Sequence, residues 1–141
     1  MGCNNKNSAN ITTTLAAGSI DSPYFVQVHI AQTLCSPVCV DDVPIFAPTF
    51  SVVGYEAVGT GQYVATIKVE GIVYYDPCGG NTCNSRSITI KQTFPVAFTS
   101  ATAPTSVTIS AGTIDNSLVA PACHNCTRDF VSDIPITITV A

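Results

Sequence analysis

Charged side chains are scarce in this sequence of 141 residues. They make up 10% of the chain, against about 25% in an average soluble protein. Nine acids and five bases give a net charge of −4, and the scattered bases form no basic stripe, so no nucleic-acid partner is expected. Hydrophobic residues reach 46%. We therefore expect a subunit whose surface is covered by neighbours, or an extracellular protein; the alternative is a neutral module coated with Ser, Thr and Asn.

Long apolar segments are also missing. No run approaches the roughly 20 residues of a membrane span, so no membrane partner is expected. The first residues, MGCNNKN, do not combine a charged start with an apolar stretch. We therefore expect no signal peptide and synthesis in a reducing cytosol. Tryptophan is absent as well, which argues against an antibody-type domain.

Helical periodicity is lacking, and apolar side chains instead alternate with polar ones, as in strands that bury one face. The alternation is clearest in four segments: 24–34, 62–75, 86–99 and 128–140. Their apolar faces form the predicted core, which comprises Tyr24, Val26, Val28, Ile30, Leu34, Tyr63, Ala65, Ile67, Val69, Val73, Tyr75, Ile88, Ile90, Phe94, Val96, Phe98, Phe130, Ile134, Ile136, Ile138 and Val140. Two further segments, 43–58 and 105–119, complete the set of predicted strands.

Six to eight such strands predict an all-β fold, a single antiparallel β-sandwich of the Ig-like or jelly-roll kind, over residues 23–141. Residues 1–22 are rich in Asn, Ser, Thr and Ala. They are predicted to be an extended N-terminal arm that orders only on a partner, with a plain disordered terminus as the alternative. Pro95 and Pro135 lie inside strand patterns and remove a ladder donor, so their strands should be edges or bulged there.

Six of the seven cysteines form three close pairs, each in a turn between two predicted strands. The pairs are Cys35 with Cys39, Cys78 with Cys83, and Cys123 with Cys126. If consecutive strands are antiparallel, the number of reversals places all three turns at one end of the sandwich. The turns at residues 59–61 and near Pro104 should lie at the opposite end.

These six cysteines are the candidate metal ligands. The spacing of Cys123 and Cys126 is that of a zinc knuckle, and a second pair would supply two more thiolates to a structural zinc ion. Six cysteines and His124 exceed one site, so one cysteine pair would be left over, or His124 would support the site without binding the metal directly. Disulfides within each turn and free thiols are the two alternatives. No cofactor other than zinc is expected.

A catalytic constellation is not recognisable. Nucleophilic catalysis needs a positioned base, and the histidines available are His29 and His124. His29 is predicted on the polar face of a strand, and His124 lies between two cysteines with no third group evident. We therefore expect a protein that is not an enzyme.

Two stretches combine Thr, Val, Ile and Phe without charges: residues 92–98, QTFPVAF, and residues 105–112, TSVTISAG. With the low charge and the polar N-terminal segment, they make the chain resemble auxiliary and decoration proteins of tailed-phage capsids, in particular virion proteins of the crAss-like group. The resemblance implies a structural virion subunit assembled in the host cytoplasm. Its partners would be other virion subunits, bound through the N-terminal arm and the apolar surface.

Two other functions stay open at this point. A subunit of an extracellular filament, cross-linked through its N-terminal arm, would use the unpaired Cys3. A secreted carbohydrate- or protein-binding module would need an aromatic platform. Its candidate residues are Tyr55, Tyr63, Tyr74 and Tyr75, and at most one of the adjacent Tyr74 and Tyr75 can face outward.

Overall fold

The described part of the chain consists of strands and turns. The structure is a computed structural model and describes residues 9–16, 22–34, 43–75, 86–119 and 128–141. Its strands are β1 (Asn10–Leu15), β2 (Tyr24–Leu34), β3 (Ile45–Phe46), β4 (Thr49–Gly59), β5 (Gln62–Tyr75), β6 (Arg86–Thr99), β7 (Val107–Ala111), β8 (Asp115–Val119) and β9 (Arg128–Val140). The described ranges contain no helix, and hence none long and apolar enough to cross a membrane. The predicted all-β class is confirmed.

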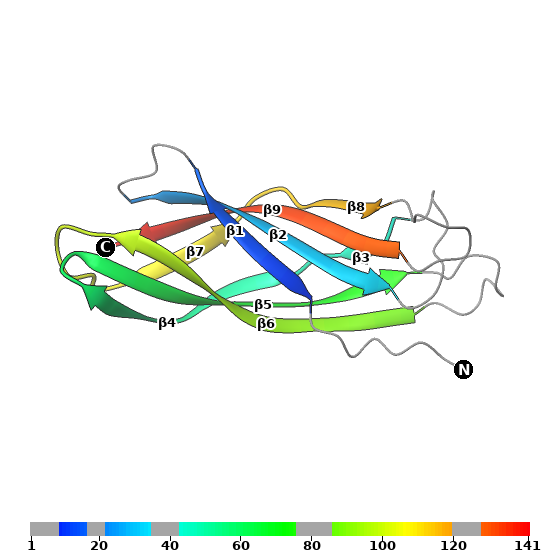
Figure 1. Cartoon of the computed structure of the whole chain (residues 1–141), viewed down its shortest axis with the longest axis horizontal. Coiled ribbons are helices and arrows are strands. Elements are labelled where there is room, and N and C mark those ends of the chain that lie inside the picture. The colour runs from blue at the N-terminus through cyan, green and yellow to red at the C-terminus, as the bar shows by residue number, and fades with distance from the viewer. Residues whose placement is uncertain (1–8, 17–21, 35–42, 76–85, 120–127) are drawn as a thin grey trace.

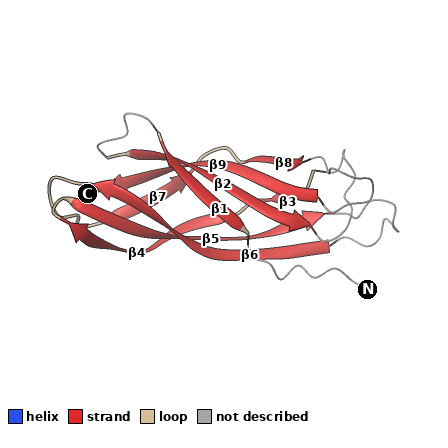
Figure 2. Ribbon diagram, viewed as in Figure 1, coloured by secondary structure: helices blue, strands red, loops and turns tan. Residues whose placement is uncertain are grey.

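The strands form two antiparallel sheets that pack face to face (Figure 1; Figure 2). In the first sheet β1 pairs with β2 and β2 with β9, while β7 and β8 follow one another along the other side of β9. In the second sheet β5 is central, with β6 on one side and β3 and β4 on the other. This arrangement confirms the predicted antiparallel β-sandwich.

The predicted strand segments correspond closely to the observed strands. β5 and β6 have 14 residues each and stay paired from Gln62 opposite Thr99 to Tyr75 opposite Arg86. The predicted segment 43–58 contains β3 and most of β4, and the segment 105–119 contains β7 and β8. Each division occurs where the chain bends along one edge of a sheet.

Burial follows the predicted alternation. All the predicted core residues are buried except Tyr63 and Val140, which are half-buried and pack against the core. Phe46 of β3 and Phe130 of β9 meet edge to face between the two sheets, with ring centroids 5.7 Å apart. Alternation therefore identified the faces that the sandwich buries, because successive side chains of a strand point to opposite sides.

The two prolines within strands have different surroundings. Pro95 lies in β6, which pairs with β5 alone among the described strands, so it occupies an edge as predicted. Pro135 lies in β9, which has partners on both sides. There the strand facing Pro135 is interrupted, because residues 112–114 stand opposite residues 134–135. This irregularity, predicted as a bulge, leaves Gly112 N–H to donate to the Pro135 carbonyl at 2.7 Å.

The N-terminal segment differs from the predicted extended arm where the structure describes it. Residues 10–15 form β1, which pairs antiparallel with β2 of the same chain, and Ile11 packs against the core. The threonines of this segment favour strand conformation, and β2 would otherwise present an open edge. Residues 10–15 are therefore an edge strand of the sandwich, while residues 1–8 and 17–21 lie outside the described residues.

Two side-chain amides bridge the sheets along the two sides of the sandwich. The Gln92 amide of β6 accepts a hydrogen bond from Ala9 N–H at 2.7 Å and donates one to the Ala9 carbonyl at 3.0 Å. On the other side, Asn116 Nδ2 of β8 donates to the Phe46 carbonyl at 3.2 Å, and Asn116 Oδ1 accepts from Ser132 Oγ at 2.8 Å. These amides hydrogen-bond to edge backbone groups and to a buried polar group that have no partner in the backbone hydrogen bonds between strands.

Replacing Asn116 with alanine should lower the free energy of unfolding by about 1–2 kcal/mol. The substitution leaves the fully buried Ser132 hydroxyl without its acceptor and the Phe46 carbonyl without its donor. Urea denaturation of this variant and of Ser117→Ala, a change at an exposed neighbour on the same strand, measures the difference. Equal stabilities of the two variants would contradict the proposed role of the amide.

Candidate functional site

The six cysteines predicted to lie at one end of the sandwich as metal ligands are outside the described residues, as are Cys3 and His124. The strand ends that flank their turns are described. Leu34 at the end of β2 faces Arg128 at the start of β9, and Val119 at the end of β8 faces Asp129. In the other sheet Tyr75 ends β5 and faces the first residue of β6. The zinc, disulfide and free-thiol alternatives stay predictions.

These strand ends belong to one end of the sandwich, here called the cysteine-loop end after the turns that they flank. The contact between Phe46 and Phe130 joins the two sheets beside it. The turn at residues 60–61 lies at the opposite end, where Ser100 N–H donates to the Gly61 carbonyl at 3.0 Å and Tyr55 Oη donates to the Pro104 carbonyl at 3.1 Å. The reversal count therefore placed the strand ends correctly.

His29 lies on the outer face of the first sheet, as predicted. Its Nδ1 lies 2.7 Å from Asp133 Oδ1 on the neighbouring strand, and both side chains are more than a third exposed. A pair this exposed contributes about 1 kcal/mol or less. Among the described residues, no three His, Cys, Asp or Glu side chains come together as a metal site. The His29–Asp133 pair links the neighbouring strands β2 and β9.

The four tyrosines proposed as an aromatic platform are separated. Tyr74 is exposed and Tyr75 is buried, which confirms that only one of the pair faces outward. Tyr55 is exposed on β4, and its hydroxyl is held by the Pro104 carbonyl near the far end of the molecule from Tyr74. Tyr63 is half-buried and packs against the core, and it lines a pocket.

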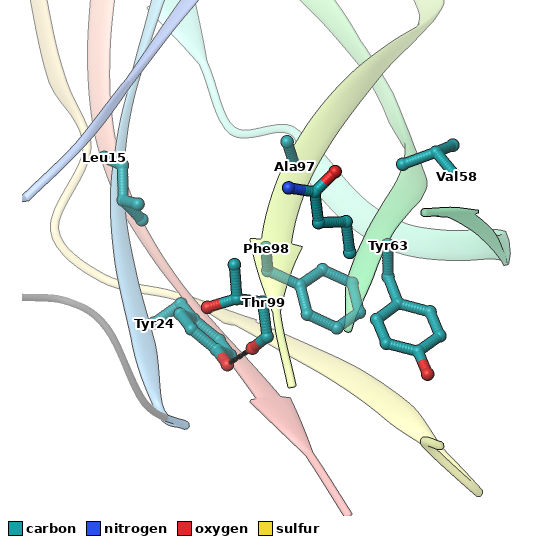
Figure 3. A pocket seen from close by; sticks show the side chains of 8 residues that line it. Leu15, Tyr24, Val58, Tyr63, Ala97, Phe98 and Thr99 are labelled. Atoms are coloured by element: carbon teal, nitrogen blue, oxygen red, sulfur yellow. Dashed lines mark hydrogen bonds between the residues drawn. The ribbon is translucent and has the colours of Figure 1, made fainter. Parts of the chain in front are cut away.

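The pocket has a volume of about 460 Å³, and Figure 3 shows the side chains that line it. It lies beside the pair Gln62–Thr99, at the end opposite the cysteine-loop end. This size is typical of ligand pockets, which span roughly 300–1,000 Å³. It lies between the C-terminal end of β1 and the paired ends of β5 and β6. Its lining residues are Leu15, Tyr24, Val58, Gln62, Tyr63, Ala97, Phe98 and Thr99. Their aromatic and aliphatic side chains make the pocket a site for an apolar group.

Three aromatic rings form one wall of the pocket. Tyr24 and Phe98 are tilted with centroids 5.5 Å apart, and Tyr63 stacks on the other side of Phe98 at 5.6 Å with an interplanar angle of 18°. The Tyr24 hydroxyl donates to the Thr99 carbonyl, which fixes the first ring (Figure 3). No carboxylate, amine or guanidinium occurs among the described lining residues. The wall is therefore rigid and neutral, and a charged ligand would find no counter-charge there.

A second apolar surface, here called the end patch, lies on the outer face of β3 and β5 near the cysteine-loop end. Its residues are Val43, Ile45, Ile72 and Tyr74, with exposed fractions of 47%, 69%, 40% and 51%. Ile45 stands directly opposite Tyr74 in the sheet register. On the other side of β5 the patch is bordered by Ser87 and Thr89. Glu70 and Lys91, joined at 3.5 Å, lie one row further along the sheet.

Sequence reasoning missed both apolar surfaces. The pattern assigned Tyr24, Tyr63 and Phe98 to the core, and it had no signal for the opening between β1 and β6. The end patch has a local signal, since Ile72 and Tyr74 are apolar residues that follow Thr66, Lys68 and Glu70 on the same face of β5. A scan against protein-family models and searches of curated proteins and of solved structures found no match to this chain.

Proposed function

We propose that this protein is a non-enzymatic structural subunit of a virion, of the auxiliary or decoration type. The observation that carries the structural role is the end patch, in which apolar side chains stand exposed on a sheet face. Exposed apolar patches with a polar border are typical of protein interaction sites. The assignment to a virion comes from the resemblance of the sequence to phage capsid auxiliary proteins.

The end patch would contribute affinity by hydrophobic burial, worth about 25 cal/mol per Å² of apolar surface removed from water. A stable interface buries about 1,000 Å² or more in total, so the neighbouring Ser87 and Thr89 would be covered too. These side chains are short and neutral, and covering them leaves no charge without a partner. The paired strands beneath would also limit the ordering cost of docking.

The proposed function predicts that the protein is present in mature particles. Mass spectrometry of density-purified virions from the phage that encodes it should detect the chain in a fixed ratio to the major capsid protein. Ile45→Lys should reduce that ratio at least tenfold, because it introduces a charge into the end patch. Ser117→Lys, a change on the outer face of the other sheet, should leave the ratio unchanged. Absence of the wild-type chain from intact particles would refute the virion assignment.

The pocket favours a second candidate function, a carbohydrate- or protein-binding module. Half-buried Tyr63 and the neutral polar groups of Gln62 and Thr99 resemble the lining of a site that binds a neutral ligand with an apolar face. Titration of the isotope-labelled protein with neutral oligosaccharides tests it. Chemical-shift changes confined to Tyr63, Leu15 and Val58 would support this function, and unchanged spectra at millimolar ligand would reject carbohydrate binding.

A further inference from the structure

The outermost strand of the first sheet is held differently from the rest of the sandwich. Among the described strands, β1 pairs with β2 alone and lies at the edge of its sheet (Figure 1). Of its six side chains, that of Ile11 is half-buried and packs against the core, and the other five are exposed. A strand with so few buried apolar contacts opens at a lower free energy than the core strands of the same protein.

The residue just before β1 is fastened to the opposite sheet by one side chain. Ala9 is 6% exposed, and both of its backbone groups bond to the Gln92 amide of β6. Ala9 N–H donates to Gln92 Oε1 at 2.7 Å, and Gln92 Nε2 donates to the Ala9 carbonyl at 3.0 Å. Loss of these bonds inside the closed structure would leave two buried backbone groups without these partners, which is costly. Gln92 therefore fixes the N-terminal end of β1 to the second sheet.

The neighbouring strand β2 has a second partner that does not involve β1. All 11 residues of β2 pair with β9. Val28 and Ile30 of β2 are fully buried in the core between the two sheets, and the β2–β9 pairing holds them there. Removal of β1 would therefore expose Ala9 and Ile11 and leave the rest of the core covered.

We infer that β1 is a strap that opens and closes as a unit on a folded sandwich, with the Gln92 amide as its latch. The closed strap occupies the edge of β2 over residues 26–31, and the open form bares the backbone groups of that edge. A bare edge strand is a template for pairing with another extended segment, so the closed strap blocks strand addition at β2. Opening also removes Leu15 from the lining of the pocket. The inference concerns a motion within one chain and does not depend on the virion assignment.

Native-state hydrogen exchange of the full-length chain, followed residue by residue by NMR, tests the strap. The protected amides of residues 10–15 should share one opening free energy, smaller than that of the core amides of β9. Their exchange should also depend only weakly on urea concentration, because opening the strap exposes little surface.

Two alanine substitutions separate opening of the strap from unfolding of the whole sandwich. Gln92→Ala should raise the exchange rates of the β1 amides about tenfold, because the closed form loses both bonds to Ala9. Thr93→Ala, a change at the exposed next residue of β6, should leave these rates unchanged. Asn116→Ala should raise the exchange rates of the β9 amides and leave those of β1 unchanged. The bonds of Asn116 to Phe46 and Ser132 do not involve β1, and they persist when the strap opens.

Three results would overturn the inference. Equal acceleration of the β1 and β9 amides in Asn116→Ala would show that β1 opens only when the whole sandwich unfolds. Unchanged β1 exchange in Gln92→Ala would show that the amide is not a latch. Protection that falls steadily from the middle of β1 toward its ends would indicate fraying residue by residue, and not the opening of a unit. The wild-type and Asn116→Ala measurements decide the matter even where Gln92→Ala does not fold.

Discussion

Replacing Phe130 with alanine should lower the free energy of unfolding by about 3–5 kcal/mol, the range measured for truncated buried aromatic residues. Phe130 is fully buried in β9, where its ring meets Phe46 of the opposite sheet edge to face. Truncation would remove that contact and leave a cavity between the two sheets. The loss should be large because the paired strands around the cavity have little freedom to close it.

Urea denaturation of purified protein measures this effect. Val119→Ala is the matched control, since Val119 lies on β8 opposite the residue next to Phe130 and is 49% exposed. The control should change stability by about 0.5 kcal/mol or less. If the alanine variant does not fold, Phe130→Leu should still fold with a smaller loss. A loss for Phe130→Ala as small as that of the control would show that the two sheets do not pack through this ring.

The second large effect is expected at Gly71, where alanine should cost about 1–3 kcal/mol by overpacking. A Cβ atom at this position would lie 2.8 Å from Pro48 Cα and 2.9 Å from Phe46 Cε1. One of these neighbours is backbone, so the bend between β3 and β4 would have to move. Gly71 is therefore the residue of β5 that lets this bend approach the centre of the sheet.

Gly54→Ala provides the control for that substitution. Nothing lies within 4 Å of the position that its Cβ would take, and Gly54 also belongs to the second sheet. Alanine there should be neutral or slightly stabilising, because it restricts the unfolded chain. Thermal unfolding of both variants should therefore shift the midpoint downward for Gly71→Ala alone. Similar midpoints would mean that the bend between β3 and β4 moves to accommodate the added Cβ atom without a loss of stability.

The sequence predicted much of the fold because the strand signal is local. In β9 the alternation from Phe130 to Ile138 is visible without any knowledge of the partner strands, and the structure buries that face. Counting reversals then placed the strand ends, since antiparallel neighbours leave little choice of direction. β1 was missed for the opposite reason. Its segment NITTTL alternates only weakly between apolar and polar residues. It forms a strand because it pairs with the open edge of β2, and the sequence of the segment itself does not reveal that partner.

The candidate site was harder to predict from the sequence than the fold, because it is formed by contacts between segments that are far apart in the chain. Tyr63 and Phe98 were correctly placed on apolar faces, but their pocket lies between β1 and β6, which belong to different sheets. Ser132 interrupts the apolar face of β9 and is nevertheless fully buried, because Asn116 accepts its hydrogen bond. A pattern of apolar and polar positions cannot reveal either arrangement. The paired cysteines, which dominated the sequence-based hypothesis, lie outside the described residues.

The position of β9 has a consequence for how the protein is made. The last strand in the sequence lies between β2 on one side and β7 and β8 on the other. While the ribosome is still producing residues 128–140, those three strands have no central partner. The second sheet uses the consecutive strands β3 to β6 and is able to form earlier. A nascent chain would therefore carry one assembled sheet and one set of open, apolar strands, so chaperone binding should be strongest just before its last strand emerges.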